Sequence, residues 1–141
     1  MIDEGLAFLP MPKAEPLLTP IPPENASREE LFAAADVVEQ LLEAMARHTP
    51  GGEDAPRFSL RAMAPGALRA LNESLGQGEV SAVVAGAHGT PDWRIQETAF
   101  AGVWRVQRED SRGGLAEDIL EAGDMPGVVR EAARQAISTR F

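Results

Sequence analysis

The sequence contains no cysteine and only two histidines among its 141 residues. The absence of cysteine excludes disulfides, thiolate nucleophiles, iron–sulfur ligation and the usual structural zinc sites. The histidines, His48 and His88, lack the H-x-x-x-H or H-E-x-x-H spacing that places two metal ligands on one helix face. We therefore expect a protein that needs no metal and no organic cofactor, and the lack of cysteine fits a reducing compartment.

Positive charge and long apolar runs are also scarce. Lysine and arginine number 13 against 22 aspartates and glutamates, which gives a formal net charge of -9. Such a chain repels phosphate backbones, so we expect no nucleic-acid partner. No segment approaches the ~20 consecutive apolar residues of a membrane span, and the amino terminus lacks the basic start of a secretory signal. These features predict a cytoplasmic protein that does not bind membranes.

Residues 1–25 form a proline-rich stretch that we expect to be an extended arm. Prolines at positions 10, 12, 16, 20, 22 and 23 remove backbone donors and disfavour helix. The arm also carries many large apolar side chains, among them Leu9 and Met11. We expect these two residues to dock on an apolar surface of the same molecule or of a neighbour, which would allow a homo-oligomer through the arm. Residues 26–141 then form a single domain.

Three helices are expected in this domain. Ser27 and Glu30 have the spacing of a capping box. An apolar stripe follows, widened by Leu41 and Ala34, that we expect to be core: Leu31, Ala35, Val38, Leu42 and Met45. A second helix is predicted over 65–75, with Pro65 in its first turn and Gly76 at its end. Asp124 is expected to cap a final helix with a core-facing stripe of Val129, Ala132, Ala133, Ala136 and Ile137.

Between the second and third helices the apolar period changes from helical spacing to two. The segments "EVSAVVAG", "RIQETAF", "VWRVQRE" and, more weakly, "AEDILEAG" are separated by short turns. We predict an α+β fold: an antiparallel meander of three to four strands, preceded by the extended arm, with the helices packed on one face.

The stretch "RIQETAFAGVWRV" (94–106) carries the candidate site of the domain. With Ala101 and Gly102 as a two-residue turn, Glu97 would lie opposite Val106, on the sheet face that also carries Trp104. Glu97 would then be an acid among apolar neighbours and would need a partner, for which the diagonal Arg108 is the candidate. One interpretation is a structural ion pair and the other is a surface that binds a partner protein.

A catalytic role is disfavoured by the same residues. No serine lies in a nucleophile-elbow pattern, and two isolated histidines do not supply a base and its orienting group. We therefore expect a protein that is not an enzyme. The alternative is an enzyme or a small-ligand-binding domain with a pocket near Gln96, Glu97 and Trp104.

Three motifs resemble a known family. "LAFLPMP", "LNESLGQGEVSAVV" and "RIQETAFAGVWRV" occur in the same order and at similar separations as in the HupH/HoxQ/HyaF family of hydrogenase expression and maturation proteins. Members of that family are about twice this length with related halves, so the chain is expected to be a single-domain relative or one half of a longer protein.

The resemblance implies a chaperone-like accessory protein in the assembly of nickel–iron uptake hydrogenase. Its implied partners are the precursor of the iron–sulfur small subunit, bound before export, and other maturation proteins. The family supplies no catalytic residues. The candidate partner-binding residues are therefore those within the matched motifs: Leu9, Met11, Glu79, Gln96, Glu97 and Trp104.

Overall fold

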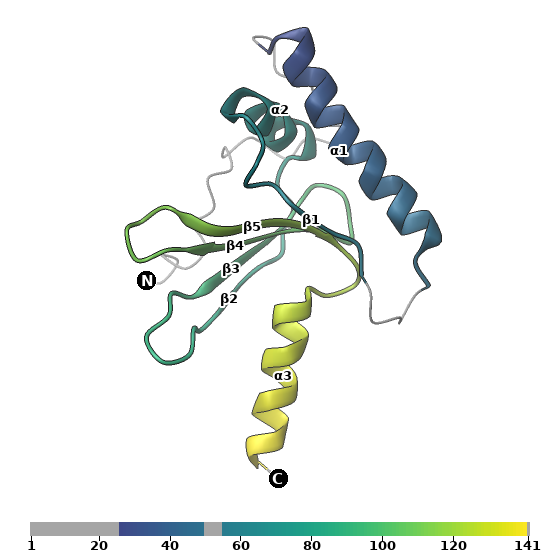
Figure 1. Ribbon diagram of the computed structural model, residues 1–141. Coiled ribbons are helices and arrows are strands. Elements are labelled where there is room, and N and C mark those ends of the chain that lie inside the picture. The colour runs from purple at the N-terminus through teal and green to yellow at the C-terminus, as the bar shows by residue number, and fades with distance from the viewer. Residues whose placement is uncertain (1–25, 50–54, 141) are drawn as a thin grey trace.

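The structure is a computed structural model that describes residues 26–49 and 55–140. Its helices are α1 (Arg28–Arg47), α2 (Pro65–Leu75) and α3 (Gly127–Arg140). Its strands are β1 (Arg57–Ser59), β2 (Ser81–Val84), β3 (Trp93–Glu97), β4 (Val103–Glu109) and β5 (Leu115–Ala122). The strands form one antiparallel sheet in the order β1-β5-β4-β3-β2 (Figure 1). The α+β class and the antiparallel meander are confirmed, and β1 adds a fifth strand at the edge beside β5.

The start of α1 has the local chemistry that the sequence predicts. Glu30 donates its backbone N–H to Ser27 Oγ at 3.1 Å, and Ser27 donates its own N–H to Glu30 Oε1 at 2.9 Å. This reciprocal pair satisfies two amides that have no partner within the helix. The bond from the Ser27 backbone lowers the pKa of the Glu30 carboxyl, because it stabilises the charged form.

The core-facing side of α1 is narrower than the predicted stripe. The buried side chains are Ala34 and Leu41, whereas Ala35 is exposed and Leu42 and Met45 are 59% and 37% exposed. Leu31 and Val38 pack against the core as predicted. The prediction was wrong for the three exposed residues, because α1 carries more apolar side chains around its circumference than α2 and the sheet can cover. The consequence is an apolar strip of α1 that faces solvent.

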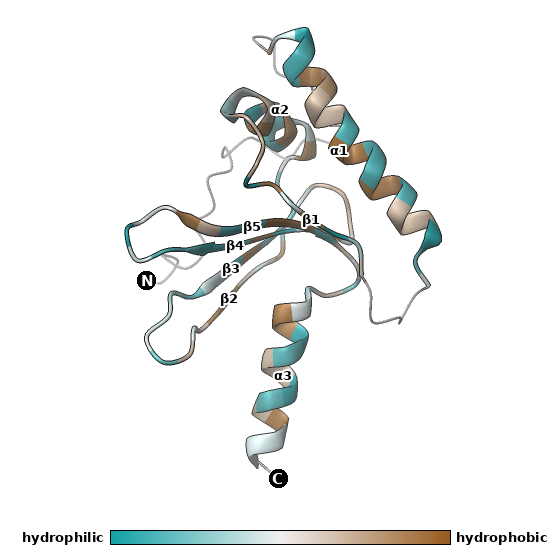
Figure 2. Ribbon diagram, viewed as in Figure 1, coloured by the Kyte–Doolittle hydropathy of each residue, from teal (hydrophilic) through white to brown (hydrophobic). Residues whose placement is uncertain are grey.

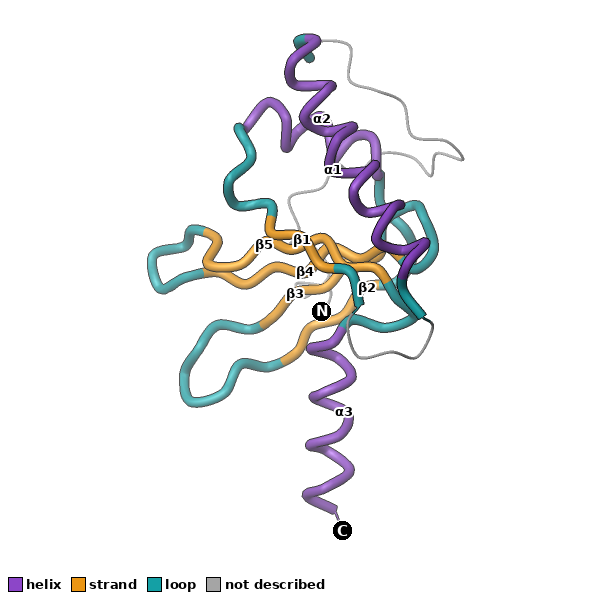
Figure 3. The backbone as a smooth tube through the Cα atoms, turned by 45° about the vertical axis from the view of Figure 1, so that its right-hand side comes forward, coloured by secondary structure: helices purple, strands orange, loops and turns teal. Residues whose placement is uncertain are grey.

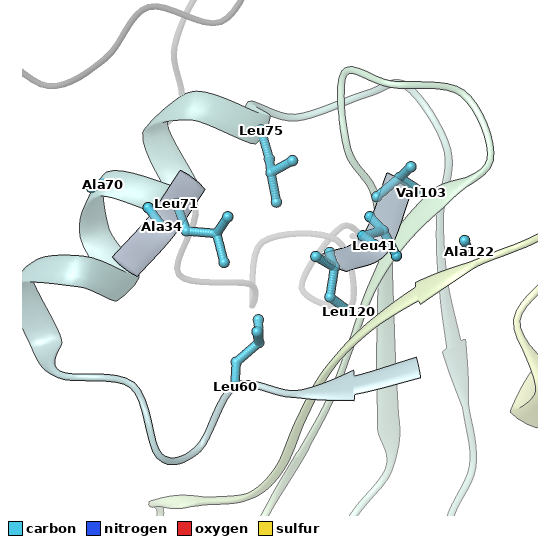
Figure 4. Close-up of a cluster of buried hydrophobic side chains, with 9 residues drawn as sticks. All are labelled: Ala34, Leu41, Leu60, Ala70, Leu71, Leu75, Val103, Leu120 and Ala122. Carbon is cyan, nitrogen blue, oxygen red and sulfur yellow. The ribbon is translucent and has the colours of Figure 1, made fainter. Parts of the chain in front are cut away.

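One face of the sheet, here called the α1/α2 face, carries the main core. Leucines from α1, α2, β5 and the segment after β1 meet Val103 and Ala122 there (Figure 4), together with Ala34 of α1 and Ala70 of α2. The fully buried members include Leu60, Leu71 and Leu120. Burying a leucine side chain stabilises the fold by about 1.5–3 kcal/mol, so this cluster determines where α1 and α2 sit.

The opposite face, here called the α3 face, carries a smaller cluster of Ile95, Trp104, Val106 and Ile119. Val128 and Val129, at the start of α3, pack against it, so the three helices divide between the two faces. Beyond this first turn α3 extends away from the sheet (Figure 3). Its predicted core-facing residues Ala133, Ala136 and Ile137 are exposed, which corrects that part of the prediction.

The start of α3 is also fixed by a different residue from the one predicted. The buried Glu121 accepts a hydrogen bond from the Gly127 N–H through Oε2 at 2.7 Å, in the role assigned to Asp124. Its Oε1 lies 3.3 Å from Arg57 Nε, within ion-pair distance but without the geometry of a hydrogen bond. A carboxylate at a helix start is stabilised by the helix dipole, so Glu121 ties β5 to α3. No helix in the described ranges is long and apolar enough to span a bilayer.

After α2, the backbone at Gly78 passes close to the backbone at Glu97 and Thr98, and this contact gives a first testable prediction. Gly78 donates its N–H to the Glu97 carbonyl at 2.8 Å, and a Cβ at this position would lie 2.4 Å from the Thr98 carbonyl oxygen. We expect Gly78→Ala to reduce the free energy of unfolding by about 1–3 kcal/mol, because the backbone itself must move. Urea denaturation measures this.

The matched control is Gly127→Ala. A Cβ there would meet only Glu121 Oε2, at an ordinary 3.7 Å, and alanine is the better helix former. Gly127→Ala should therefore unfold at the same or a higher urea concentration than the unmodified chain. Equal midpoints for Gly78→Ala and the unmodified chain would show that the close approach is not a constraint.

Candidate functional site

The candidate stretch 94–106 covers most of β3, the turn that follows and the first half of β4. Glu97 pairs with Trp104 and Ile95 with Val106, whereas the sequence predicted Glu97 opposite Val106. The register differs because the turn runs from Thr98 to Gly102 and is closed by a Thr98 N–H bond to the Val103 carbonyl, 2.9 Å long. A shift of two residues keeps every side chain on its predicted face.

Trp104 lies on the α3 face and is only 8% exposed. Its indole N–H donates to the Gly123 carbonyl at 2.8 Å, and Gly123 donates its N–H to the Gly102 carbonyl at 2.8 Å. Gly102 and Gly123 have φ values of 79° and 149°, a region that favours glycine. Trp104 therefore joins the β3–β4 turn to the connection between β5 and α3.

Glu97 is partly exposed and belongs to the same arrangement. Its Oε2 accepts a hydrogen bond from the Gly102 N–H at 3.3 Å. The predicted partner, Arg108, lies opposite Trp93 instead, with its guanidinium carbon 4.7 Å from the centre of that ring. The expected Glu97–Arg108 pair was wrong because the shifted register moves Arg108 away from Glu97 and onto an aromatic face, which attracts cations.

Gln96 lies on the other face of the sheet, separate from Glu97 and Trp104. It is 2% exposed, and its side-chain amide donates to the carbonyls of Gly78 and Val80 at 3.0 and 3.2 Å. Gln96 thereby holds the loop between α2 and β2, which presents Glu79 to solvent. Of the other candidates, Leu9 and Met11 lie outside the described residues.

A buried polar network on the α1/α2 face was not found from the sequence. Arg105 is 1% exposed and forms two hydrogen bonds to Asp118, of 2.5 and 2.8 Å. Arg105 also donates to the Asn72 side chain of α2, and Gln107 donates to Asp118 Oδ1 at 3.3 Å. This set of four residues, the Arg105 network, ties α2 to β4 and β5.

The signal for this network was present in the strand alternation. Since Trp104 and Val106 face one side, Arg105 and Gln107 must face the other, which also carries Val103. A charged residue at a helix-covered strand position requires a buried partner of opposite charge. The sequence could therefore have indicated an acid on the neighbouring strand.

A groove lies between α1 and α2 where the strip of α1 faces solvent. Its volume is about 530 Å³, and its lining is almost wholly apolar: Leu31, Ala34, Ala35, Val38, Glu39, Leu42, Leu71 and Ser74. In the part of the chain that the structure describes, no group of three or more histidine, aspartate or glutamate side chains is placed to hold a metal ion. The accessible feature of this domain is thus an apolar surface.

The fold and the site define a small α+β domain in which Gln96, Trp104 and Arg105 are buried and hydrogen-bonded within the scaffold, and in which apolar side chains line a groove between two helices. Residues 31–139 match the family model described as the HupH hydrogenase expression protein, C-terminal conserved region. The chain therefore belongs to this family, as its three motifs indicated.

Individual relatives agree with the family match. The chain is 36% identical over 133 residues to the hydrogenase expression/formation protein HoxQ of Cupriavidus necator, and 33% identical over 132 residues to HupQ of Azotobacter chroococcum. These alignments cover 94% and 93% of the chain but 45% of each relative, so the chain spans less than half their length. The solved structure of the hydrogenase expression protein HupH from Thiobacillus denitrificans matches with a TM-score of 0.55 and 28% identity, covering 81% of this chain and 95% of that one.

Proposed function

We propose that this chain is a non-catalytic, chaperone-like accessory domain in the maturation of nickel–iron hydrogenase, and that it binds the precursor of the iron–sulfur small subunit. The observation that carries the proposal is the family match, which extends from α1 to α3. The relatives are named as hydrogenase expression or formation proteins. Binding before export would place this step in the cytoplasm.

The chemistry of the chain suits such a client. A small subunit that carries iron–sulfur clusters presents many cysteines, and thiols exchange readily with other thiols and disulfides. A binding domain with no cysteine of its own cannot enter that exchange. The groove between α1 and α2 supplies an apolar surface on which a polypeptide can be held without covalent chemistry.

The alternative function, a ligand pocket near Gln96, Glu97 and Trp104, receives less support from the geometry. Gln96 faces the α1/α2 side of the sheet, whereas Glu97 and Trp104 face the α3 side. Gln96 and Trp104 are both buried and already hydrogen-bonded within the domain. One ligand could not contact all three residues without opening the sheet.

Co-purification tests the proposal. The tagged chain is expressed with the small-subunit precursor and, separately, with the hydrogenase large subunit. We expect the precursor, and not the large subunit, to be retained at a stoichiometry near one to one. Retention of neither subunit, or of the large subunit only, would contradict the proposed client. A tagged protein of similar size and charge from outside the family controls for non-specific retention.

A further inference from the structure

We propose that the groove between α1 and α2 is a docking site for a helical segment of the partner, with an apolar face and basic residues beside it. This inference rests on the proposed function in one respect, since the segment would belong to the client. The proposal otherwise depends on the shape, the exposure and the charge of residues in α1 and α2.

The dimensions of the groove fit a short helix. Its lining on α1 extends from Leu31 to Leu42, which is about 16 Å at a rise of 1.5 Å per residue, or three helical turns. Two alanines, Ala34 and Ala35, lie in the middle of this length and leave room for a neighbouring side chain. Leu71 and Ser74 of α2 form the other wall.

Large apolar side chains of the same helix are exposed both in the groove, at Leu42, and outside its lining, at Phe32 and Met45. Phe32 and Leu42 are 68% and 59% exposed, and Met45 is 37% exposed. Apolar positions recur along the whole of α1 in Figure 2. Contiguous exposed apolar surface of this kind marks an interaction site, because leaving it in water is unfavourable.

The occupant must satisfy its own backbone hydrogen bonds. Both walls of the groove are helices, in which the N–H and C=O groups bond within the helix, so the groove offers no row of free backbone partners. An extended segment that added to a sheet edge would have such partners, whereas one lying here would bury its own unpaired groups. A helix has no such penalty and packs by its side chains.

The charge around the groove selects a basic occupant. Between Arg28 and Arg47, every charged residue of α1 is an acid: Glu29, Glu30, Asp36, Glu39 and Glu43. Glu39 lines the groove itself, whereas α2 carries one base, Arg69, and one acid, Glu73, so the negative charge beside the groove comes from α1. A segment with lysine or arginine beside its apolar face would be attracted, particularly at low ionic strength.

The same charges disfavour the two other occupants. In a symmetric contact between two copies, each acidic rim would face another acidic rim, and each chain carries a net charge of -9. Residues 1–25 contain four acids and a single lysine, Lys13, so they too are poorly matched to this rim. A basic segment of a different polypeptide meets both the apolar and the electrostatic requirements.

Two synthetic peptides test the site on the full-length chain. Both form a 15-residue amphipathic helix with the same leucine face, and they carry either arginine or glutamate beside it. We expect only the arginine peptide to bind in fluorescence anisotropy. Leu42→Lys should weaken its binding by about tenfold or more, because it places a charge in the apolar groove. Glu39→Gln should weaken it about threefold at low salt, and this difference should disappear at high salt.

The matched control for Leu42→Lys is Ile137→Lys, a substitution at a residue that is 60% exposed on the remote helix α3. It should leave peptide affinity unchanged. Equal effects of the two substitutions, equal binding of the glutamate peptide, or no binding of either peptide would overturn the proposal. A dimer that Leu42→Lys dissociates would assign the groove to a second copy. A rise in peptide affinity in Leu9→Glu and Met11→Glu would assign it to the arm.

Capture of the small-subunit precursor separates this inference from the proposed function. If the unmodified chain and the Leu42→Lys variant retain the precursor equally, the groove is not the docking site and the proposed function stands. If the arginine peptide binds in the groove but no precursor is retained, the groove is a real site and the proposed client is wrong. If Leu42→Lys loses the precursor and Ile137→Lys retains it, the result supports both the groove as the docking site and the proposed function.

Discussion

Replacing Arg105 by methionine is expected to lower the free energy of unfolding by about 3–5 kcal/mol. The substitution removes the guanidinium that forms two hydrogen bonds to Asp118 of β5 and one to Asn72 of α2. It leaves Asp118 as a buried carboxylate, 2% exposed, with only the Gln107 amide as a side-chain donor. An unpaired buried charge destabilises the fold by more than the intact ion pair stabilises it. Urea denaturation followed by circular dichroism measures the loss.

A second substitution distinguishes an unpaired charge from a loss of packing. In the variant with both Arg105→Met and Asp118→Leu, neither charge of this buried pair remains, and most of the lost stability should return. The surface pair of Arg134 and Glu131, 66% and 54% exposed, is the matched control, and Arg134→Met should change stability by less than about 1 kcal/mol. If the double variant is no more stable than Arg105→Met, the loss of stability comes from the missing shape of the arginine side chain and not from an unpaired charge.

The elements that depend on local chemistry were predictable from the sequence. Ser27 and Glu30 determine where α1 starts. Pro65 starts α2 and Gly76, with φ of 66°, ends it. Strands β2 to β5 follow the alternation of apolar residues, since a period of two exposes one face of each strand to the core. These signals act over a few residues, so they can be recognised without knowledge of the tertiary structure.

The missed features depend on contacts between distant parts of the chain. The buried side of α1 is set by the area that α2 and the sheet cover, and the helical period cannot distinguish Leu41 from its neighbour Leu42. The three residues of β1 are too few to show alternation, and their pairing with β5 spans more than 50 positions. The register of β3 and β4 was misjudged because a five-residue turn replaced the two-residue turn assumed.

The candidate site was anticipated in its location more than in its chemistry. Strand alternation placed Glu97 and Trp104 on one face, and the structure agrees. The use of the Trp104 indole could not be predicted, because its acceptor at Gly123 is 19 residues away. The exposed apolar strip of α1 was read as core for the same reason. A sequence shows which residues are apolar, but only the fold shows which of them remain uncovered.

Removing the Trp104 side chain is expected to have an effect as large as that of breaking the Arg105 network. Trp104→Ala should lower the free energy of unfolding by about 3–5 kcal/mol, because it removes the largest side chain of the α3-face cluster and leaves a cavity there. Trp104→Phe keeps an aromatic ring but removes the N–H that bonds to the Gly123 carbonyl, for an expected loss of about 1–3 kcal/mol. Comparison of the two unfolding curves separates the hydrogen bond from the packing.

The same variants test whether this face takes part in recognition of the client. Trp104 is 8% exposed, so Trp104→Phe should retain the small-subunit precursor normally at temperatures where it is folded. Glu97 is partly exposed, and Glu97→Gln removes its charge while keeping an oxygen for the Gly102 N–H, so stability should change by less than about 1 kcal/mol. Weaker capture by Glu97→Gln at unchanged stability would assign this carboxylate to the binding surface. Normal capture by both folded variants would make the pair a determinant of the fold. Recognition would then depend on other surfaces, and the groove between α1 and α2 is the surface that we propose.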